Sequence, residues 1–334
     1  MPRIVQVGVG PLGQNMVRFM QERNEAGSDF RIVGAVDPAP ELVGKDLGEV
    51  CEMGRMGVSI RPDVASALGR RKADVAVLTT VSDIKRITGQ VDALAAAGLN
   101  IVSTCEELSF PWRAATRSAR KIDRLCRDRG VTCLGTGVNP GYLMDLLPVA
   151  LTAPCQRVDR IEVHRIQDAS TRRIPFQQKI GAGLTRRQFE AKQAEGTLRH
   201  VGLTESMDMI ASRLGWQLER TTETLKPVMA TKKVTSGYTP IPKGVARGVE
   251  QISRASAGGK EVIRLVFRAA VGEPESVDRI RIKGKPNLEM RIAGGVHGDI
   301  ATCAIVLNCV ERVMKAEPGL KTMIDLPPAA FSWR

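Results

Sequence analysis

Several features that would narrow the class of this protein are missing from its sequence. No apolar run approaches the ~18–20 residues that a membrane-spanning helix needs, so we expect no membrane attachment. Aromatic residues make up only 4% of the 334 residues, and none is interleaved with basic residues in the way that base stacking requires. We therefore interpret the net charge of +13 as a solvated basic surface and expect no nucleic-acid partner.

Cysteine and histidine occur in patterns that support neither disulfides nor metal binding. The seven cysteines are scattered without C-x-x-C spacing, which is typical of reduced thiols in the cytoplasm. Only three histidines occur, at positions 164, 200 and 297, and they form no H-x-x-x-H pair, so we expect no zinc site. The first expected strand begins at residue 4, which leaves no room for a signal or transit peptide. These observations predict a cytoplasmic protein without a metal.

The most informative motif lies at the N-terminus. Residues 4–7 have the pattern of a buried strand and run into a G-x-G-x-x-G segment, which an amphipathic stretch at residues 14–23 follows. In this order, the glycines allow a tight turn and let a pyrophosphate approach the helix N-terminus. A second strand at residues 30–36 ends in an aspartate, where an acidic residue would meet the ribose hydroxyls. A purely structural glycine turn is the alternative. We predict a dinucleotide site that includes Gly8, Gly10, Pro11, Leu12, Gly13 and Asp37.

Strands and helices alternate through the first 138 residues. Further strands are expected at residues 58–60, 73–80, 100–104 and 131–135, with helices at 84–97 and 112–129. This alternation predicts an α/β dinucleotide-binding domain with a doubly wound parallel sheet, a Rossmann domain, at residues 1–138. Ligands of such sheets lie outside the carboxyl ends of the strands. Further candidates for cofactor binding are therefore Thr79, Thr80, Ser82, Thr104 and Asn139.

The pattern changes after residue 138. Alternating apolar and polar runs, as at residues 263–269 and 279–283, predict a second, α+β domain on a mainly antiparallel sheet, which a helical region at 185–218 interrupts. A final helix is expected over 299–315, with Asp299 suited to its N-cap. We predict a substrate and dimerisation domain at residues 139–298, and a C-terminal helix and tail at 299–334 that return to the first domain.

Two adjacent glutamates follow the fifth expected strand. Glu106 and Glu107 would lie at the sheet end where the nicotinamide of a bound cofactor belongs. Neighbours along an extended chain point in opposite directions, so only one of the two would face a substrate. A carboxylate at that place is suited to proton transfer. The alternative is that both are loop carboxylates, favoured by the dipole of the following helix.

Six motifs carry a resemblance that extends along the chain. They are GVGPLG (8–13), STCEEL (103–108), GVNPGYLMD (137–145), DASTRRIPFQQKIGAG (168–183), HVGL (200–203) and HGDIAT (297–302). With these motifs the sequence is similar to the 2,4-diaminopentanoate dehydrogenase family and the related native NAD(P)H-dependent amine dehydrogenases. Its first domain resembles that of dihydrodipicolinate reductase. The resemblance implies a homodimer that converts a small amine reversibly to a ketone or aldehyde plus ammonia. It also implies a glutamate of the CEEL segment as catalytic acid/base, which we assign to Glu106, with Glu107 as the alternate.

The same motifs suggest a substrate pocket and a cofactor preference. Asp37 should favour NAD by repelling a 2′-phosphate, whereas Lys45 and the positive net charge would neutralise that phosphate, so we predict that both NAD and NADP are used. A histidine beside a turn more often satisfies backbone groups than performs chemistry. A structural role therefore remains the alternative for His200. The candidates for the pocket wall are Val138, Tyr142, Thr171, Phe176 and His200.

Two other functional classes remain. One is another NAD(P)-dependent oxidoreductase that acts on a carbonyl or sugar-type substrate. Sugar-type enzymes of this architecture carry an E-K-P motif after the fifth strand, where Glu107 and Leu108 stand here. Dihydrodipicolinate reductase itself would show a histidine pair with a nearby lysine, and this sequence has none. The other class is a dinucleotide-sensing protein, but no helix-turn-helix segment is present to bind DNA.

Overall fold

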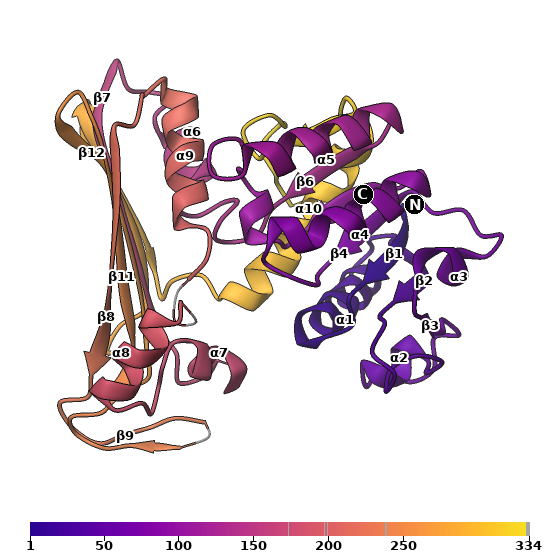
Figure 1. Cartoon of the computed structure of the whole chain (residues 1–334), viewed down its shortest axis with the longest axis horizontal. Helices are drawn as coiled ribbons and strands as arrows, with labels where there is room; N and C mark the ends of the chain where they lie inside the picture. Colours follow the sequence, from indigo (N-terminus) through magenta and orange to yellow (C-terminus); the bar gives the residue numbers. More distant parts are fainter. Residues whose placement is uncertain (173, 197, 199, 238, 332–334) are drawn as a thin grey trace. The chain divides into compact units, whose positions relative to one another are not determined.

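A computed structural model divides the chain into two compact units (Figure 1). The first unit comprises Met1–Leu146 and His297–Arg334, and the second comprises Leu147–Val296. The structure describes residues 1–172, 174–196, 198, 200–237 and 239–331. Arg173, which belongs to the 168–183 motif, lies outside the described residues. Among the residues described, no helix combines the length and the apolarity that a membrane crossing requires.

A seven-stranded sheet forms the centre of the first unit. Its neighbouring strands all run parallel, which confirms the predicted doubly wound fold class. The third strand includes Ile60 and Arg61 rather than residues 58–60. In spatial order the strands are β15 (Gly319–Lys321), β6 (Thr132–Gly135), β5 (Asn100–Ser103), β4 (Val75–Leu78), β1 (Arg3–Val7), β2 (Arg31–Val36) and β3 (Ile60–Arg61).

Helices cover both faces of this sheet. Three of them, α3 (Val64–Leu68), α4 (Ile84–Ala96) and α5 (Thr116–Asp128), bury apolar side chains in one core cluster with the strands. On the other face, α1 (Pro11–Glu25) and α10 (Gly298–Lys315) pack together, and α10 also contacts β5 and β6. A short helix, α2 (Leu47–Val50), contributes to a smaller cluster beside β2 and β3.

The N-cap of α10 differs from the expectation. His297, rather than Asp299, caps the helix, because its Nδ1 accepts a hydrogen bond from the Ile300 N–H at 3.5 Å. Asp299 instead lies in the first turn, where its negative charge is favourable to the helix dipole.

A six-stranded mixed sheet forms the second unit. In the described residues, the β7–β12 pair is its one parallel pair and the other pairs are antiparallel, so the predicted mainly antiparallel sheet is confirmed. A two-stranded pair, β9 (Val234–Thr235) and β10 (Pro240–Ile241), lies apart from it. In spatial order the large sheet contains β14 (Leu288–Ala293), β13 (Val277–Lys285), β7 (Arg157–Asp168), β12 (Lys260–Ala270), β11 (Ala246–Ala257) and β8 (Arg220–Met229).

The helices of the second unit lie on one face of its sheet (Figure 1). The predicted helical region at 185–218 consists of two helices, α8 (Arg186–Ala194) and α9 (Leu203–Leu214). Helix α9 packs on β11 and β12. Two short helices, α6 (Leu146–Leu151) and α7 (Ile174–Lys179), precede them in the sequence.

The two faces of this sheet differ in chemistry because successive side chains of a strand point to opposite faces. The face toward α9 is buried and mainly apolar, as at Ile263, Leu265 and Phe267 of β12, with a few buried polar side chains such as Arg165 and Gln251. We call the other one the open face. It carries charged side chains around an apolar centre and consists mainly of Glu162, His164, Ile166, Glu250, Ile252, Arg254, Arg264, Val266 and Arg268.

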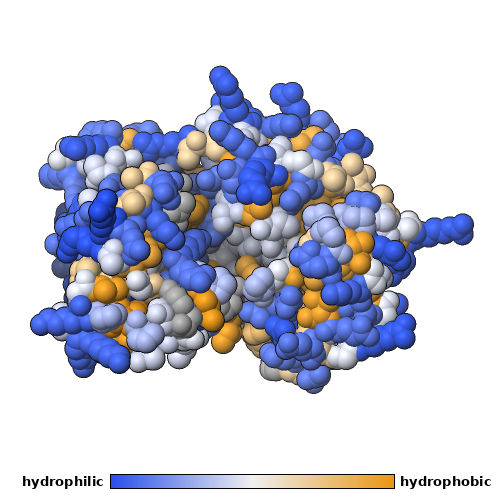
Figure 2. Space-filling model, turned by 60° about the horizontal axis from the view of Figure 1, so that its bottom comes forward, coloured by the Kyte–Doolittle hydropathy of each residue, from blue (hydrophilic) through white to orange (hydrophobic). Residues whose placement is uncertain are grey.

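Hydrophilic side chains cover most of the surface that Figure 2 shows on each unit, and hydrophobic residues gather in separate patches. This distribution agrees with the composition, in which 25% of the residues are charged.

Candidate cofactor and catalytic site

The glycine-rich turn after β1 has the backbone geometry that close approach of a ligand requires. Gly8 adopts φ +86°, a conformation that side chains rarely tolerate. A Cβ on Gly13 would lie 2.0 Å from the carbonyl oxygen of Gly8, so only glycine permits this packing of helix on strand. Gly10 is the extended N-cap of α1, and in the described structure a Cβ there would meet no atom within 4 Å. Pro11 occupies the first turn of the helix, where a missing N–H costs nothing.

Asp37 connects the end of β2 to this turn. One carboxylate oxygen accepts the Val9 N–H at 2.8 Å, and the other accepts the Ala39 N–H at 3.0 Å. The side chain is half-buried. The aspartate therefore braces the glycine turn and places its negative charge directly beside it. The glycines and this carboxylate fit a bound dinucleotide, because open backbone N–H groups and an acceptor for ribose hydroxyls meet at one sheet end.

Of the two threonines that follow β4, Thr79 holds the glycine turn through its side chain. Thr79 Oγ1 donates to the Gly8 carbonyl at 3.0 Å and accepts from Gln6 Nε2 at 2.9 Å. Gln6 is fully buried in β1 and was not among the predicted site residues, because a glutamine inside an apolar strand gives no motif signal. Thr80 is exposed and donates to Gln90 Oε1 at 2.6 Å. Leu12 of the turn is half-buried.

The two glutamates after β5 lie in a turn of 3₁₀-helix, η1 (Glu106–Leu108). The expectation of an extended segment here was wrong, because backbone hydrogen bonds close the turn: the Leu108 N–H donates to the Cys105 carbonyl at 3.1 Å. The turn begins beside β4, since the Thr104 N–H donates to the Leu78 carbonyl at 3.0 Å. It places Glu106 and Glu107, both half-buried, at the carboxyl end of the sheet.

Glu107 has a structural partner in the neighbouring helix. Its Oε2 accepts the Ile84 N–H of α4 at 3.0 Å, and its own N–H donates to the Ser82 carbonyl at 3.3 Å. Asp83 caps the same helix through the Arg86 N–H at 2.9 Å. The backbone carbonyl of Glu106 accepts the Ser109 hydroxyl at 2.8 Å, which holds its turn in place. In the described structure, the hydrogen bond to α4 is thus made by the carboxylate of Glu107, whereas Glu106 contributes through its backbone.

The GVNPGYLMD segment forms a tightly bonded loop after β6. The Asn139–Pro140 peptide is cis, and Gly141 adopts φ +125°. The buried carboxylate of Asp145 accepts the N–H groups of Gly141 and Leu146, each at 2.7 Å. Val138 and Asn139 are buried in this loop, and Tyr142 is half-buried.

A second motif meets this loop. The Val138 N–H donates to Thr302 Oγ1 on α10 at 3.3 Å, so residues of HGDIAT and GVNPGYLMD lie in contact although the two motifs are far apart in sequence. Asp145 and Thr302 were not predicted as site residues. The sequence signal that could have identified them is that each belongs to one of the six motifs.

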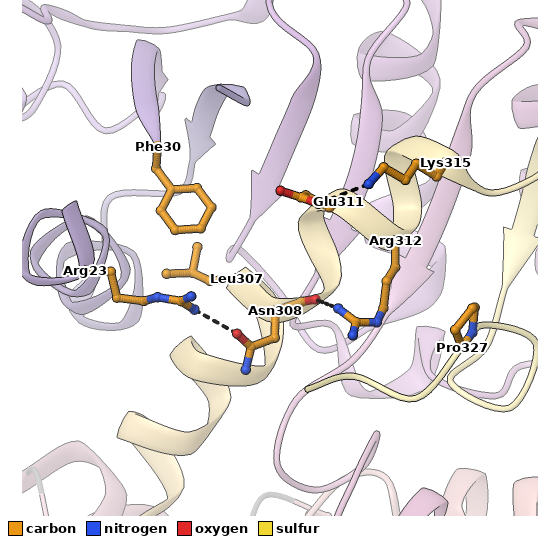
Figure 3. A pocket seen from close by; sticks show the side chains of 8 residues that line it. All are labelled: Arg23, Phe30, Leu307, Asn308, Glu311, Arg312, Lys315 and Pro327. Atoms are coloured by element: carbon orange, nitrogen blue, oxygen red, sulfur yellow. Dashed lines mark hydrogen bonds and ion pairs between the residues drawn. The ribbon is translucent and has the colours of Figure 1, made fainter. Parts of the chain in front are cut away.

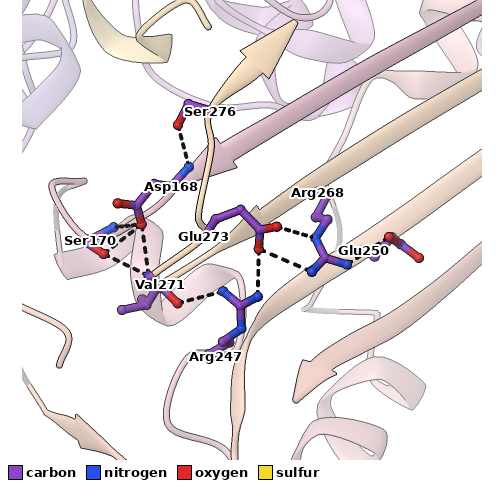
Figure 4. A network of polar contacts seen from close by, with 9 residues as sticks. Asp168, Ser170, Arg247, Glu250, Arg268, Val271, Glu273 and Ser276 are labelled. Carbon is purple, nitrogen blue, oxygen red and sulfur yellow. Dashed lines mark hydrogen bonds and ion pairs between the residues drawn. The ribbon is translucent and has the colours of Figure 1, made fainter. Parts of the chain in front are cut away.

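In the second unit, many polar groups of the 168–183 motif bond within the unit. Asp168 accepts the Gly272 N–H at 2.9 Å and the Ser170 hydroxyl at 2.7 Å. The turn after β12 is held further by Glu273, which bonds Arg247 at 2.8 Å and Arg268 at 3.1 Å (Figure 4). Through Oδ1, Asp168 therefore ties the 168–183 motif to this turn.

The three predicted pocket residues of the second unit have distinct surroundings. Thr171 is exposed. Phe176 on α7 lies under the guanidinium of buried Arg172, with 4.1 Å from the guanidinium carbon to the ring centroid. The His200 ring stacks on Phe267 with centroids 4.4 Å apart. Gln251 of β11 accepts the N–H of His200 at 2.7 Å and donates to its carbonyl at 3.0 Å.

A buried ion pair holds the last residue of the second unit. Arg165 Nη1 contacts both oxygens of Asp278 at 3.1 Å, and the two side chains are 2% and 1% exposed. The Val296 backbone is bonded on both sides, because its N–H donates to Asp278 at 2.7 Å and its carbonyl accepts from Arg165 at 2.9 Å. Burial raises the pKa of Asp278, and the nearby Arg165 opposes that shift.

Comparisons with known proteins agree with this architecture. The family model of the 2,4-diaminopentanoate dehydrogenase C-terminal domain matches residues 142–332. The 2,4-diaminopentanoate dehydrogenase of Acetoanaerobium sticklandii is 30% identical over 97% of this chain and 93% of its own length. An amine dehydrogenase of Streptomyces virginiae is 23% identical, with 96% and 94% covered. The structure of an amine dehydrogenase from Mycobacterium smegmatis superimposes with a TM-score of 0.87 at 23% identity, covering 100% of this chain and 98% of that one.

The fold, the glycine turn and these relatives define a dehydrogenase built from a Rossmann unit and a mixed-sheet unit. More specifically, the chain belongs to the 2,4-diaminopentanoate dehydrogenase family. The predicted family and enzyme class are thereby confirmed. The roles of individual site residues stay predictions.

Proposed function

We propose that this protein is an NAD(P)-dependent amine dehydrogenase that converts a small amine reversibly to a ketone or aldehyde plus ammonia. The observation that carries the proposal is the pair of glutamates in η1, in a chain that is similar over nearly its full length to 2,4-diaminopentanoate dehydrogenase. The turn follows β5 and stands at the same sheet end as the glycine turn after β1. One of the two carboxylates, that of Glu107, is engaged by α4, which supports Glu106 as the acid/base.

The dinucleotide would be held by the glycine turn, with its pyrophosphate at the N-terminus of α1 and a ribose near Asp37. When bound, its nicotinamide supplies the hydride for reductive amination and accepts it in deamination. We propose that NAD and NADP are both used, because Asp37 opposes a 2′-phosphate while Lys45 and the positive net charge favour it. Thr79, Thr80, Ser82, Thr104 and Asn139 remain candidates for further cofactor contacts.

The carboxylate of Glu106 would move the protons of the reaction. In the amination direction it takes a proton from ammonium, which frees the nitrogen lone pair for attack on the carbonyl carbon. The protonated carboxyl then gives this proton to the carbinolamine hydroxyl, which leaves as water. The resulting iminium cation is stabilised by the negative carboxylate that remains. In deamination, the same carboxylate accepts the proton of the amine.

We assign dinucleotide binding to the first unit and contacts with the substrate to residues of both units. Val138 and Tyr142 are candidates in the first, and Thr171, Phe176 and His200 are candidates in the second. The stack of Phe176 on Arg172 makes Phe176 a rigid apolar wall, and the hydrogen bonds of His200 to Gln251 fix its position. We further propose that the enzyme works in the cytoplasm, where its seven unbridged cysteines would stay reduced.

We also propose a homodimer that forms through the open face of the second unit's sheet. The described helices of this unit leave that face uncovered (Figure 1), and Ile166, Ile252 and Val266 form an apolar centre there. Around this centre, arginines and glutamates alternate across neighbouring strands, as at Arg268 and Glu250 with 3.2 Å between them. A mixed pattern of charges is self-complementary when two copies meet around a two-fold axis.

A turnover assay tests the proposed reaction. NADH or NADPH consumption should be measured with a panel of short ketones and aldehydes, with and without ammonium. Strict dependence on ammonium is the expected result. Carbonyl reduction that proceeds without ammonium would replace this proposal with an alcohol or sugar dehydrogenase, and absence of turnover with every carbonyl would favour a dinucleotide-sensing protein.

A further inference from the structure

The edge strand β3 brings an arginine beside the residue that follows β2. Val36 of β2 and Arg61 of β3 are register partners in parallel strands, and the Asp37 N–H donates to the Arg61 carbonyl at 2.9 Å. Arg61 is the last residue of β3. Because the carboxyl ends of parallel strands meet at one edge of a sheet, Arg61 stands at the edge where a ribose is proposed to lie, one strand away from Asp37.

Arg61 is closer to Asp37 than Lys45, the cation that the sequence suggested. Lys45 lies on the other side of β3, because its carbonyl accepts the Ile60 N–H at 2.9 Å and the Gly44 N–H donates to the Ile60 carbonyl at 2.9 Å. The backbone of Lys45 is therefore two strand spacings from β2, roughly 10 Å, whereas that of Arg61 is one spacing away. A long arginine side chain can cross a single spacing.

The side chain of Arg61 is exposed and has no hydrogen bond or ion pair within the described part of the chain. Two carboxylates near it bond other groups. Asp37 accepts two backbone N–H groups, and Asp63 caps α3 by accepting the N–H of Ser66 at 2.9 Å and its hydroxyl at 2.8 Å. Both carboxylates keep their charge, so a ligand here would depend on the fork of one guanidinium rather than on a net positive field.

Two arginines elsewhere in the first unit are held by the protein itself. Near the C-terminal end of α1, Arg23 donates to Asn308 Oδ1 at 2.7 Å, and Arg312 donates to the Asn308 carbonyl at 2.5 Å (Figure 3). The guanidinium carbon of Arg23 also lies 4.8 Å from the centre of the Phe331 ring. These contacts give both arginines a structural use, and in the described structure Arg61 has no contact of this kind.

We propose that Arg61 binds the 2′-phosphate of NADP and so lets the enzyme use NADP in spite of Asp37. This inference rests on the proposed function, because it requires a dinucleotide at the glycine turn. A guanidinium pairs with a phosphate through two parallel hydrogen bonds, which would offset the repulsion between that phosphate and the Asp37 carboxylate. NAD has a neutral hydroxyl in the same place and gains much less from the charge. Arg61 thus sets cofactor specificity and takes no part in proton transfer.

Fluorescence titrations with NADPH and NADH test the assignment through binding, without turnover. Arg61→Gln removes the charge and should raise the Kd of NADPH about tenfold or more, while the Kd of NADH changes less than about twofold. Arg61→Lys keeps the charge but loses the fork, so its Kd for NADPH should lie between those of the parent and Arg61→Gln. The control is Arg70→Gln, because Arg70 is exposed in the segment that leads into β4. It should bind both cofactors like the parent.

Titration calorimetry with two fragments assigns the effect to the phosphate. Adenosine 2′,5′-bisphosphate should lose affinity for Arg61→Gln as NADPH does, and adenosine 5′-monophosphate should bind it like the parent. Parent-like binding of NADPH by Arg61→Gln, or an equal rise of Kd for NADPH and NADH, would overturn the proposal. If ammonium-dependent oxidation of NADH persists beside either result, the proposed reaction stands and only the phosphate contact is wrong. If the parent binds neither cofactor, the proposed function fails and this inference fails with it.

Discussion

At the scale of single residues, the two adjacent glutamates of η1 differ in the hydrogen bonds that the described structure gives them. Glu107 accepts a backbone N–H at the start of α4, which is work that a helix cap commonly does. Glu106 uses its backbone carbonyl to close the turn, and its side chain is half-buried at the sheet end. This contrast supports the assignment of proton transfer to Glu106.

We predict that Glu106→Gln lowers ammonium-dependent turnover by a factor of about 10²–10⁴, as is usual when a general acid/base is lost. Cofactor binding, measured through the change in NADH fluorescence, should persist because the glycine turn is unchanged. Glu107→Gln is the matched control, since its amide oxygen can still accept the Ile84 N–H, and it should retain activity within a few-fold. If Glu107→Gln loses turnover while Glu106→Gln keeps it, Glu107 is the acid/base and Glu106 is not. Near-normal rates in both would exclude a carboxylate mechanism at this turn.

Asp37 also acts at this scale, and it has two separable effects. Its charge would repel a 2′-phosphate, while its oxygens hold the Val9 and Ala39 N–H groups. Replacement by alanine removes both effects, and replacement by asparagine removes the charge but keeps an oxygen acceptor.

We predict that Asp37→Ala raises the ratio of kcat/KM for NADPH over NADH about five- to tenfold, because roughly 1 kcal/mol of charge repulsion disappears. Asp37→Asn should shift the ratio in the same direction with a smaller loss of overall efficiency, since the turn stays braced. Steady-state kinetics with NADH and with NADPH measure kcat/KM for each cofactor and so give both the ratio and the overall efficiency. An unchanged ratio in both variants would mean that Asp37 does not meet the ribose.

At the scale of elements, side-chain contacts join neighbouring strand ends of the first sheet. The start of β1 is joined to the residue before β4: Arg3 donates from its N–H at 2.8 Å and from Nε at 3.0 Å to Oδ2 of Asp74. Asn100 of β5 donates to the carbonyl of Asp74 at 3.1 Å. The hydrogen bond from the Arg3 side chain lowers the pKa of Asp74 below its ordinary value.

This shift predicts how the pair contributes to stability with pH. The pKa of Asp74 is lower in the folded chain than in the unfolded chain. At pH values between these two pKa values the unfolded chain binds more protons, so the free energy of unfolding rises with pH in that range. The contribution is complete above the ordinary value of about 3.9 and is lost as pH falls through the folded pKa. Asp74→Asn should therefore lower Tm by about 1–3 °C at pH 7, and the deficit should shrink below about pH 4. Calorimetric scans at a series of pH values measure the Tm difference from the parent. Asp92→Asn, on the exposed face of α4, is the control. A deficit that grows in acid would contradict the assignment.

At the scale of the whole molecule, the proposed surface for self-association is the open face of the second unit's sheet. Its open face holds half-buried apolar side chains, such as Ile252, which lies between Val266 of β12 and Thr224 of β8. A sheet face of this kind is suited to a standard-sized interface between two copies.

We predict that the parent chain is a dimer in solution and that Ile252→Glu shifts it toward the monomer, with a dissociation constant raised at least about tenfold. An unpaired carboxylate at the centre of the contact would be desolvated, which is costly. Ile252→Thr, of similar shape, should stay dimeric. Light scattering coupled to size-exclusion chromatography measures the mass, and circular dichroism checks that the variant is folded. A monomeric parent, or an Ile252→Glu variant that is still fully dimeric, would rule out this face.

The sequence by itself determined the class of fold and the place of the glycine turn after β1, because both depend on local information. The alternation of apolar strands with amphipathic helices is readable within each segment, and only glycine tolerates the backbone of Gly8 and the contact at Gly13. Six motifs of four to sixteen residues were sufficient to identify the family that the comparisons confirm.

Only the tertiary structure decided how the side chains of these motifs are used. Glu107 meets Ile84, and Val138 meets Thr302, so each partner is separated in sequence by tens of residues or more than a hundred. Asp168, the first residue of the 168–183 motif, holds a turn about a hundred residues later in the sequence. Hydrogen bonds of this kind depend on which strand ends lie side by side, and strand order is set by the packing of the whole sheet rather than by any local pattern.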